Sequence, residues 1–291
     1  MNGAILVNKP KGPTSQSVVH KIKKKFDLKT VGHSGTLDPM AEGLLVILIG
    51  KATRLQFLFL DADKGYRARI LLGKKTDTDD VTGEVIKEEE FSVPSSQKDE
   101  ALVRIKDRFL GKYSQVPPNY SALRVNGKRS YKIARAGGEV VLKAREVEIK
   151  ELNLSFFDER RIDCDVSCSK GTYIRSLARD IGEFLGSFGT LEELVRNFSE
   201  PFSLDKAVTL ETLLASKKLD DYLISMEELV SGISRFDLSE QDCKSLRLGQ
   251  QHPLSCLQNK DTDLAAIFRH GELFEGLIQK YEFEWKIRFL V

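Results

Sequence analysis

The chain has 291 residues, of which 41% are hydrophobic and 30% are charged, and its formal net charge is +2. This length predicts one large domain, or one domain with an appended module, and the apolar share is enough for a buried core. The small net charge excludes no partner by itself, because local clusters of charge decide binding more than their sum does.

The first 85 residues read as strands with one helix between them. Apolar residues at 18, 19, 22 and 26 predict a helix over 15–26, with Thr14 or Ser15 as its N-cap. Strands are expected at 4–8, 43–50 and 65–73, and a turn over 73–85 leads into another strand. In the third of these strands, one face holds the alternating residues Tyr66, Ala68, Ile70 and Leu72.

The middle of the chain contains an insertion of different character. An amphipathic helix is predicted over 97–111, closed by Gly111 at its C-cap position. The segment from about 115 to 142 is rich in proline, glycine and basic residues, and 121–145 holds seven basic residues against one acid. Two strands follow at 146–157 and 162–169, and then a helix at 173–186.

The last third changes composition again. From 205 to 240 there are eight acidic residues against four basic ones, and the tail ends in the strand-like sequence EWKIRFLV. The elements interleave without a strict βαβ rhythm, which predicts an α+β fold with a mixed or antiparallel sheet flanked by helices. We expect a main domain over 1–231 and a small β-rich module over 232–291.

Metal ligation and export are not indicated. No two cysteines form a C-x-x-C pair, and no His/Cys spacing matches a metal motif. Cys164 and Cys168 would share one face of a strand, so we expect small core residues. The N-terminus lacks the basic region of a signal peptide, and no apolar run approaches about 20 residues, which predicts a cytoplasmic protein that does not associate with membranes.

The segment GHSGTLDPMAEG, residues 32–43, is a charged, glycine-rich loop placed directly before an apolar run. Asp38 and Pro39 could simply start a helix, as an Asp N-cap with Pro at the first helical position. The loop does not fit G-x-S-x-G, because Thr36 occupies the last glycine position, and the following Lys51-Ala52 does not fit a P-loop.

Four segments in order resemble the TruB family of tRNA pseudouridine synthases: residues 32–54, 64–85, 116–137 and 169–182. The resemblance implies isomerisation of a uridine at position 55, in the T loop of tRNA. Uracil is detached at N1, turned, and rejoined to the ribose through C5, without metal or cofactor. It also implies that the C-terminal tail takes the place of the family's PUA module, a small RNA-binding β barrel, and we expect a monomer.

The resemblance also assigns site residues. Asp38 becomes the catalytic aspartate, Arg175 its cationic partner, and Tyr66 the residue against the target uracil. The implied substrate-binding residues are His33, which helps to displace the base, the pocket-lining Leu191, Tyr173, and the basic residues Lys128, Arg129, Lys132 and Arg135. The family pattern around Leu191 is altered, with Thr190 and Val195 at two of its positions.

Physical arguments leave alternatives beside these roles. Arg175 would lie in the first turn of its helix if Thr172 caps it, where the helix dipole disfavours a cation, so it needs an anionic partner or is a solvated surface residue. Tyr66 could be an ordinary core residue. Asp38 could attack C1′, attack the uracil ring, or remove a ribose proton.

Two other functions fit parts of the pattern. The chain could be a non-catalytic protein that binds or folds tRNA on the same scaffold, although the presence of Asp38, Tyr66 and Arg175 disfavours this. It could also be a carboxylate glycosidase acting on nucleosides, which would release uracil and would not need the basic residues between 121 and 145.

Overall fold

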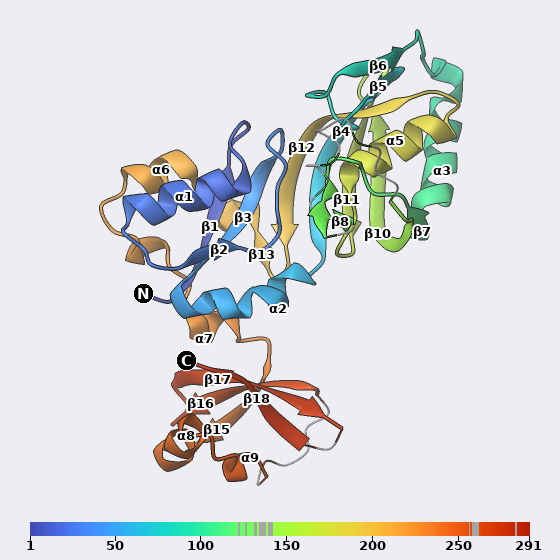
Figure 1. Ribbon diagram of the computed structural model, residues 1–291. Helices are drawn as coiled ribbons and strands as arrows, with labels where there is room; N and C mark the ends of the chain where they lie inside the picture. The colour runs from blue at the N-terminus through green and yellow to red at the C-terminus, as the bar shows by residue number, and fades with distance from the viewer. Residues whose placement is uncertain are drawn as a thin grey trace.

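The computed structural model describes residues 1–291 except 122, 126, 131–132, 134–137, 139–141, 256, 258–261 and 283 (Figure 1). Its two main parts are a ten-stranded mixed sheet with helices and a separate four-stranded sheet formed by the end of the chain. The predicted α+β class and the small C-terminal sheet are therefore confirmed. Among the helices of the described ranges, none combines the length and apolar character needed to cross a lipid bilayer.

The large sheet has the strand order β14-β1-β3-β12-β4-β11-β10-β7, with β2 paired to β3 and β13 paired to β12. Two of its pairs are parallel, β1 with β14 and β3 with β12, and the others are antiparallel. The strands are β1 Gly3–Lys9, β2 Val31–His33, β3 Glu42–Ile49, β4 Lys64–Leu72, β7 Gly111–Gln115, β10 Arg145–Phe156, β11 Arg161–Cys168, β12 Gly189–Ser199, β13 Phe202–Ser203 and β14 Val208–Thr209.

Strand β3 is buried because both faces of its half of the sheet are covered. One face packs against α1 (Ser15–Lys25) and α6 (Leu210–Ala215), and the other against the short helices α2 (Gln56–Leu60) and α7 (Met226–Leu229). This explains why its sequence is continuously apolar rather than alternating. Thr14 caps α1 by accepting from the Ser17 N–H, so the first of the two predicted caps is the correct one.

Strand β12 joins the two halves of the sheet. Its parallel register with β3 is short, pairing Val195 with Glu42 and Arg196 with Gly43, whereas it runs along the whole of β4. Gly43 has a φ of +101°, and a Cβ there would lie 2.5 Å from the Arg196 carbonyl oxygen. Only glycine therefore permits this close crossing, which fixes the glycine-rich loop against the middle of the sheet.

The other half of the sheet carries the predicted alternation. On β4, Tyr66, Ala68, Ile70 and Leu72 are buried and Arg67 is exposed, as expected. Helices α3 (Lys98–Phe109) and α5 (Ile174–Phe184) lie beside this half, and the hairpin of β5 (Lys74–Thr76) and β6 (Val85–Glu88) extends from it (Figure 1). Cys164 and Cys168 are buried free thiols on one face of β11, as predicted.

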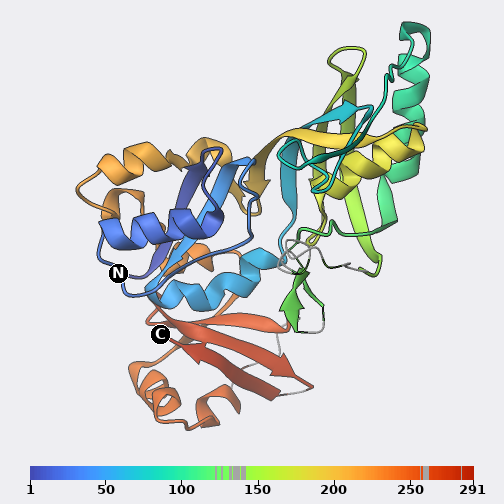
Figure 2. The same ribbon diagram turned by 45° about the horizontal axis from the view of Figure 1, so that its top comes forward.

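The C-terminal sheet packs against the main part through α7 and the outer face of β1 and β3. Ala266, Phe268, Phe274 and Leu277 share one apolar cluster with residues of those elements. Figure 2 shows this sheet beneath α2. Its elements are β15 Ser234–Leu238, α8 Glu240–Arg247, α9 His252–Ser255, β16 Leu264–Arg269, β17 Leu273–Tyr281 and β18 Glu284–Leu290.

Three local expectations need correction. Asp38-Pro39 starts no helix: the Ala41 N–H donates to the Asp38 carbonyl in a turn that leads directly into β3. Helix α5 has Tyr173 rather than Thr172 at its N-cap, and the Thr172 hydroxyl instead donates to the Ser169 carbonyl. The C-cap of α3 is Leu110, and Gly111, with φ +86°, begins β7, which the sequence did not predict.

Candidate active site

A cavity of about 340 Å³ opens where four parts of the chain meet. These are the loop before β3, strands β4 and β12, the start of the insertion, and the first turn of α5. Asp38, Tyr66, Tyr173 and Arg175 all line it, although the sequence separates Asp38 from Arg175 by 137 residues. Its volume lies at the lower end of the roughly 300–1,000 Å³ of small-molecule sites.

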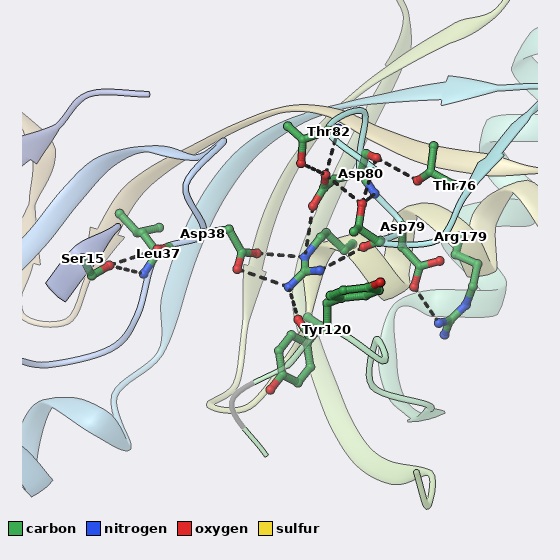
Figure 3. A network of polar contacts seen from close by, with 12 residues as sticks. Ser15, Leu37, Asp38, Thr76, Asp79, Asp80, Thr82, Tyr120 and Arg179 are labelled. Atoms are coloured by element: carbon green, nitrogen blue, oxygen red, sulfur yellow. Dashed lines mark hydrogen bonds and ion pairs between the residues drawn. The ribbon is translucent and has the colours of Figure 1, made fainter. Parts of the chain in front are cut away.

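The loop that carries Asp38 is anchored on both sides of that residue. The Ser15 hydroxyl donates to the Leu37 carbonyl at 2.9 Å and accepts from the Leu37 N–H at 2.8 Å, as Figure 3 shows. On the other side, the Lys9 ammonium donates to the Pro39 carbonyl at 3.4 Å. The loop backbone is thus fixed before any substrate arrives, which holds the Asp38 side chain in one place.

Lys9 is an unusual anchor because it is fully buried. Its ammonium also donates to the carbonyls of Pro10 and Pro13, each at 2.9 Å. Burial lowers the pKa of Lys9 to about 8, and the nearby Asp38 carboxylate opposes this shift.

Asp38 and Arg175 form a bidentate ion pair. Arg175 Nε lies 2.8 Å from one carboxylate oxygen and Nη2 lies 3.2 Å from the other. The Arg175 side chain is 5% exposed and that of Asp38 is 32% exposed, so the carboxylate faces the cavity while the guanidinium lies behind it. The pairing that the family resemblance implied is therefore present, and the surface alternative for Arg175 is wrong.

A second carboxylate supports Arg175 from the side away from the cavity. Asp80 Oδ2 lies 3.7 Å from Arg175 Nε, and its side chain is 6% exposed (Figure 3). Asp80 is held by the Thr82 N–H at 2.9 Å and by the Thr78 hydroxyl at 3.0 Å. Asp80 and Asp38 together provide the anionic partner that a cation in the first turn of a helix requires. Asp80 was not predicted from the sequence, where its only signal is the acidic run TDTDD inside one of the segments that resemble the family.

The remaining donors of Arg175 bind the loop that carries Asp80 and the start of the insertion. Nη1 donates to the Thr78 carbonyl at 2.9 Å, and Nη2 donates to the Tyr120 carbonyl at 3.0 Å. Further along α5, Ser176 and Arg179 both donate to the Val116 carbonyl at 2.8 Å. The helix that carries Arg175 therefore also holds the chain where it enters the insertion.

Tyr66 is both a buried residue and part of the cavity wall. It pairs across the sheet with Arg196, which is 1% exposed. Burial raises the pKa of Tyr66, and the neighbouring Arg196 guanidinium opposes the shift. A neutral phenol at the cavity wall can stack on a base and exchange a hydrogen bond with it.

Arg196 is another residue of the site that was not predicted from the sequence. Nε donates to the Leu44 carbonyl at 2.7 Å and Nη2 to the Gly35 carbonyl at 3.2 Å, so it ties β12 to the glycine-rich loop. The signal was available, because residue 196 keeps an arginine of the family pattern next to the altered Val195.

Tyr173 lies at the cavity between two residues from the ends of the insertion. Gln115 accepts from the Tyr173 N–H at 2.8 Å and donates to its carbonyl at 3.1 Å. The Arg145 guanidinium lies over the Tyr173 ring, 4.7 Å from its centroid.

The other expected substrate-binding residues lie apart from this cavity or outside the described residues. His33 is on β2, and burial lowers its pKa. Leu191 is fully buried on β12, and Leu194 of the same strand lines the cavity instead. The backbone of Lys128 and Arg129 forms a short hairpin strand, whereas Lys132 and Arg135 lie outside the described residues.

Comparison with known proteins gives two adjoining family matches. Residues 23–174 match the TruB family pseudouridylate synthase N-terminal domain, and residues 175–231 match the tRNA pseudouridylate synthase B C-terminal domain. The chain is 45% identical over 249 residues to tRNA pseudouridine synthase B of Acholeplasma laidlawii, with 86% of each chain covered. It is 42% identical over 235 residues to the Alkaliphilus oremlandii protein of that name, covering 81% of this chain and 77% of the relative.

Solved structures share the fold at lower identity. A Cbf5–Nop10–Gar1 complex contains a chain that matches with a TM-score of 0.71 and 24% identity, covering 99% of this chain and 84% of that one. An archaeal box H/ACA Nop10–Cbf5 complex gives a TM-score of 0.70 and 23% identity, covering 99% and 85%. The arrangement of both sheets therefore also occurs in these known structures.

Proposed function

The chain belongs to the TruB family of pseudouridylate synthases, and we propose that it converts the uridine at position 55, in the T loop of tRNA, to pseudouridine. The proposal rests above all on one observation. An Asp38 carboxylate, paired with a buried arginine, faces a nucleoside-sized cavity whose lining includes further cations and aromatic rings. This arrangement suits chemistry on a single nucleotide of an RNA.

Asp38 acts on the bond between uracil and ribose. Breaking a glycosidic bond builds positive charge on the sugar, and a carboxylate held at the cavity wall stabilises that charge or traps it. Arg175 orients the carboxylate through two hydrogen bonds. Its Nε and Nη2 donate to the carboxylate from the side of the protein, so the exposed part of Asp38 is directed toward the substrate.

The uracil ring must stay bound after it is detached, because it is turned and rejoined through C5. Tyr66 offers a ring for the base to stack on, and such stacking is worth about 1–3 kcal/mol per base. A base in a folded T loop reaches this cavity only if it is extruded from its stack, at a cost of a few kcal/mol. We assign His33 to that extrusion, from its place on β2 beside the loop that carries Asp38.

RNA outside the target nucleotide contacts two further regions. The insertion near 115–142, with Lys128, Arg129, Lys132 and Arg135, binds phosphates of the T stem-loop, and Leu191 supports the pocket from within the sheet. Residues 1–231 form the catalytic domain, and the module over 232–291 acts as a PUA-like RNA-binding unit. The protein acts as a monomer in the cytoplasm, because one chain supplies all residues assigned to the cavity and its substrate is tRNA.

One experiment separates this function from its rivals. The protein is incubated with an unmodified tRNA transcript, pseudouridine is mapped along the RNA, and free uracil is measured. We expect pseudouridine at position 55 and no free uracil. A protein that only binds or folds tRNA would leave the uridine unchanged, and a glycosidase would release uracil. Pseudouridine at another position would contradict the assignment of the T loop.

A further inference from the structure

Four cationic side chains line the cavity, those of Lys64, Arg145, Arg175 and Arg196. Among the lining residues that the structure describes, Asp38 is the one carboxylate they face. A nucleotide inside an RNA chain carries a phosphodiester on each side. The excess positive charge of the cavity therefore matches the charge of such a substrate, and the cations differ in which of them has N–H groups left to donate.

Lys64 has no donor left for substrate. Its side chain is buried, and its ammonium donates to three carbonyls at or just after the end of α2, those of Phe59, Leu60 and Ala62, at 3.4, 3.0 and 2.5 Å. An ammonium has three N–H groups, so all of them are used. Lys64 therefore stabilises the C-terminal end of a helix beside the cavity.

Arg175 and Arg196 are also committed to the protein. Arg175 donates to Asp38, Thr78 and Tyr120, and both arginines are at least 95% buried. Arg196 donates to the carbonyls of Leu44 and Gly35, and it pairs with Tyr66 of the neighbouring strand β4. Redirecting either guanidinium toward a phosphate would break contacts that hold the cavity together.

Arg145 differs in each respect. It is half-buried, and its Nη2 donates to the Gly171 carbonyl. No carboxylate of the described residues lies within 4.0 Å of its guanidinium nitrogens, and its Nε is enclosed without a hydrogen-bond partner in that part of the chain. Arg145 is therefore the least buried and least bonded of the three arginines that line the cavity.

The stacking of Arg145 on Tyr173 prepares it for an anion. A guanidinium donates in its own plane, so a ring against its face does not block the Nη1 donors, which have no acceptor among the described residues, or the second N–H of Nη2. Tyr173 is itself fixed by the two hydrogen bonds to Gln115, and this limits the freedom that Arg145 would lose on binding. Arginine is also suited to phosphate because two parallel N–H groups can bind two phosphate oxygens.

The place of Arg145 in the sheet supports the same role. It begins β10 and pairs across with Gln115, which ends β7, so these two residues form the base of the insertion. An RNA that contacts both the insertion and the cavity must pass this base. We propose that Arg145, supported by the Tyr173 ring, binds the phosphodiester next to the target uridine and so fixes the register of the RNA in the cavity. This inference rests on the proposed function, because it requires an RNA substrate.

The test combines a protein variant with RNA in which one charge is removed. Arg145→Gln and Arg145→Lys are made in an Asp38→Asn background, so that RNA is bound but not consumed. Their binding to T-stem-loop RNAs is measured, with a methylphosphonate at each linkage flanking the target uridine in turn. Arg67→Gln is the matched control, because Arg67 is an exposed arginine on β4 outside the cavity lining. Thermal unfolding of each variant reports its folding.

We expect Arg145→Gln to weaken binding about tenfold and to reduce the slope of log K against log salt by about 0.7–0.9, as for one lost phosphate contact. Arg145→Lys should keep the slope. A methylphosphonate at one of the flanking linkages should weaken binding about tenfold when Arg145 is present, and less than twofold in Arg145→Gln. Arg67→Gln should bind all of these RNAs like the Asp38→Asn protein from which it is made. If every flanking methylphosphonate weakens binding equally with and without Arg145, or if the slope is unchanged, the inference is wrong.

These outcomes are separate from those that test the proposed function. If the protein with Asp38 intact makes no pseudouridine while the binding results hold, the isomerase assignment fails and the phosphate contact stands. If pseudouridine forms normally and Arg145→Gln does not change RNA binding, the function stands and the Arg145 inference fails.

Discussion

Two of the protein's arginine–aspartate ion pairs lie in opposite surroundings. Arg67 and Asp165 pair at 3.4 Å on the open face of the sheet, with side chains 72% and 60% exposed. Arg175 and Asp38 pair at 2.8 Å, with side chains 5% and 32% exposed. The exposed pair is screened by water and contributes about 0–1 kcal/mol at most, whereas burying the other pair costs solvation that must be recovered from additional partners.

The buried pair has those partners. Asp80, Thr78 and Tyr120 complete the contacts of Arg175, and Ser15 and Lys9 hold the backbone around Asp38. An ion pair on this sheet therefore acquires a function through its burial and its supporting contacts rather than through its chemical type. Substitutions should therefore affect activity or stability in decreasing order: first of Asp38, then of Arg175, then of a supporting residue, and last of the exposed pair.

Removing the carboxylate should have the largest effect. Asp38→Asn keeps the shape of the side chain but removes the anion, so we expect kcat to fall by at least about 10³-fold while tRNA binding stays nearly intact. Single-turnover pseudouridine formation and a separate binding measurement give the two quantities. Activity within tenfold of the unaltered protein, once deamidation has been excluded by mass spectrometry, would falsify the assignment of Asp38.

Removing the cation should follow. Arg175→Met should lower kcat by about 10²-fold with a smaller change in KM, because the two hydrogen bonds that orient the Asp38 carboxylate are lost. The split between kcat and KM is the specific readout. If kcat is unchanged and only KM rises, Arg175 acts as a phosphate contact instead.

The buried lysine that supports the Asp38 loop should give a pH-dependent stability. Its pKa is lowered to about 8 in the folded protein, against about 10.5 when unfolded. Between these values the unfolded chain binds more protons, so the contribution of Lys9 to the free energy of unfolding rises with pH, by up to about 3 kcal/mol.

Denaturant unfolding from pH 7 to 11, for the unaltered protein and for Lys9→Met, measures this contribution as a difference. The comparison is needed because Cys164 and Cys168, with pKa values raised to about 12, contribute with the opposite sign above pH 9 in both proteins. A parallel pH dependence in the two proteins would show that Lys9 is not the responsible group.

The carboxylate on the far side of Arg175 should have an intermediate effect. Asp80→Asn keeps its size but removes one of the two anions beside the guanidinium, so we expect kcat to fall about tenfold and the free energy of unfolding to fall by about 1–3 kcal/mol. Thr82→Val, which removes one donor to Asp80, should show a weaker form of the same change. Equal activity of Asp80→Asn and the unaltered protein would remove Asp80 from the site.

The exposed pair should have the smallest effect. Arg67→Ala, Asp165→Ala and the double variant should each change the free energy of unfolding by less than about 1 kcal/mol, with a coupling energy of about 0.2–1 kcal/mol. Pseudouridine formation should not change. A coupling energy as large as that between Asp38 and Arg175 would contradict the view that burial distinguishes the two pairs.

The local elements and the identity of the chemical groups could be predicted from the amino-acid sequence. Alternation over β4, the continuous apolar run of β3 and the capped helix α1 were all visible, because each depends on neighbouring residues. The family-like segments pointed to Asp38, Tyr66 and Arg175, and the structure brings these three residues together at one cavity. Their catalytic roles remain proposals that the substitutions above test.

Which further charges contact or support that cavity depends on long-range packing, and it became visible only in the folded structure. Strand β12 was not predicted, because register shifts at 191/193 and 196/198 interrupt its alternation and place charged residues within it. Arg196, Asp80 and Lys9 are buried against groups that lie elsewhere in the chain, as the Leu44 carbonyl does for Arg196. Arg145 keeps unused N–H donors because the fold places few acceptors near its guanidinium. A local pattern carries no information on such distances, since the partners of a buried charge are set by how whole strands and helices pack.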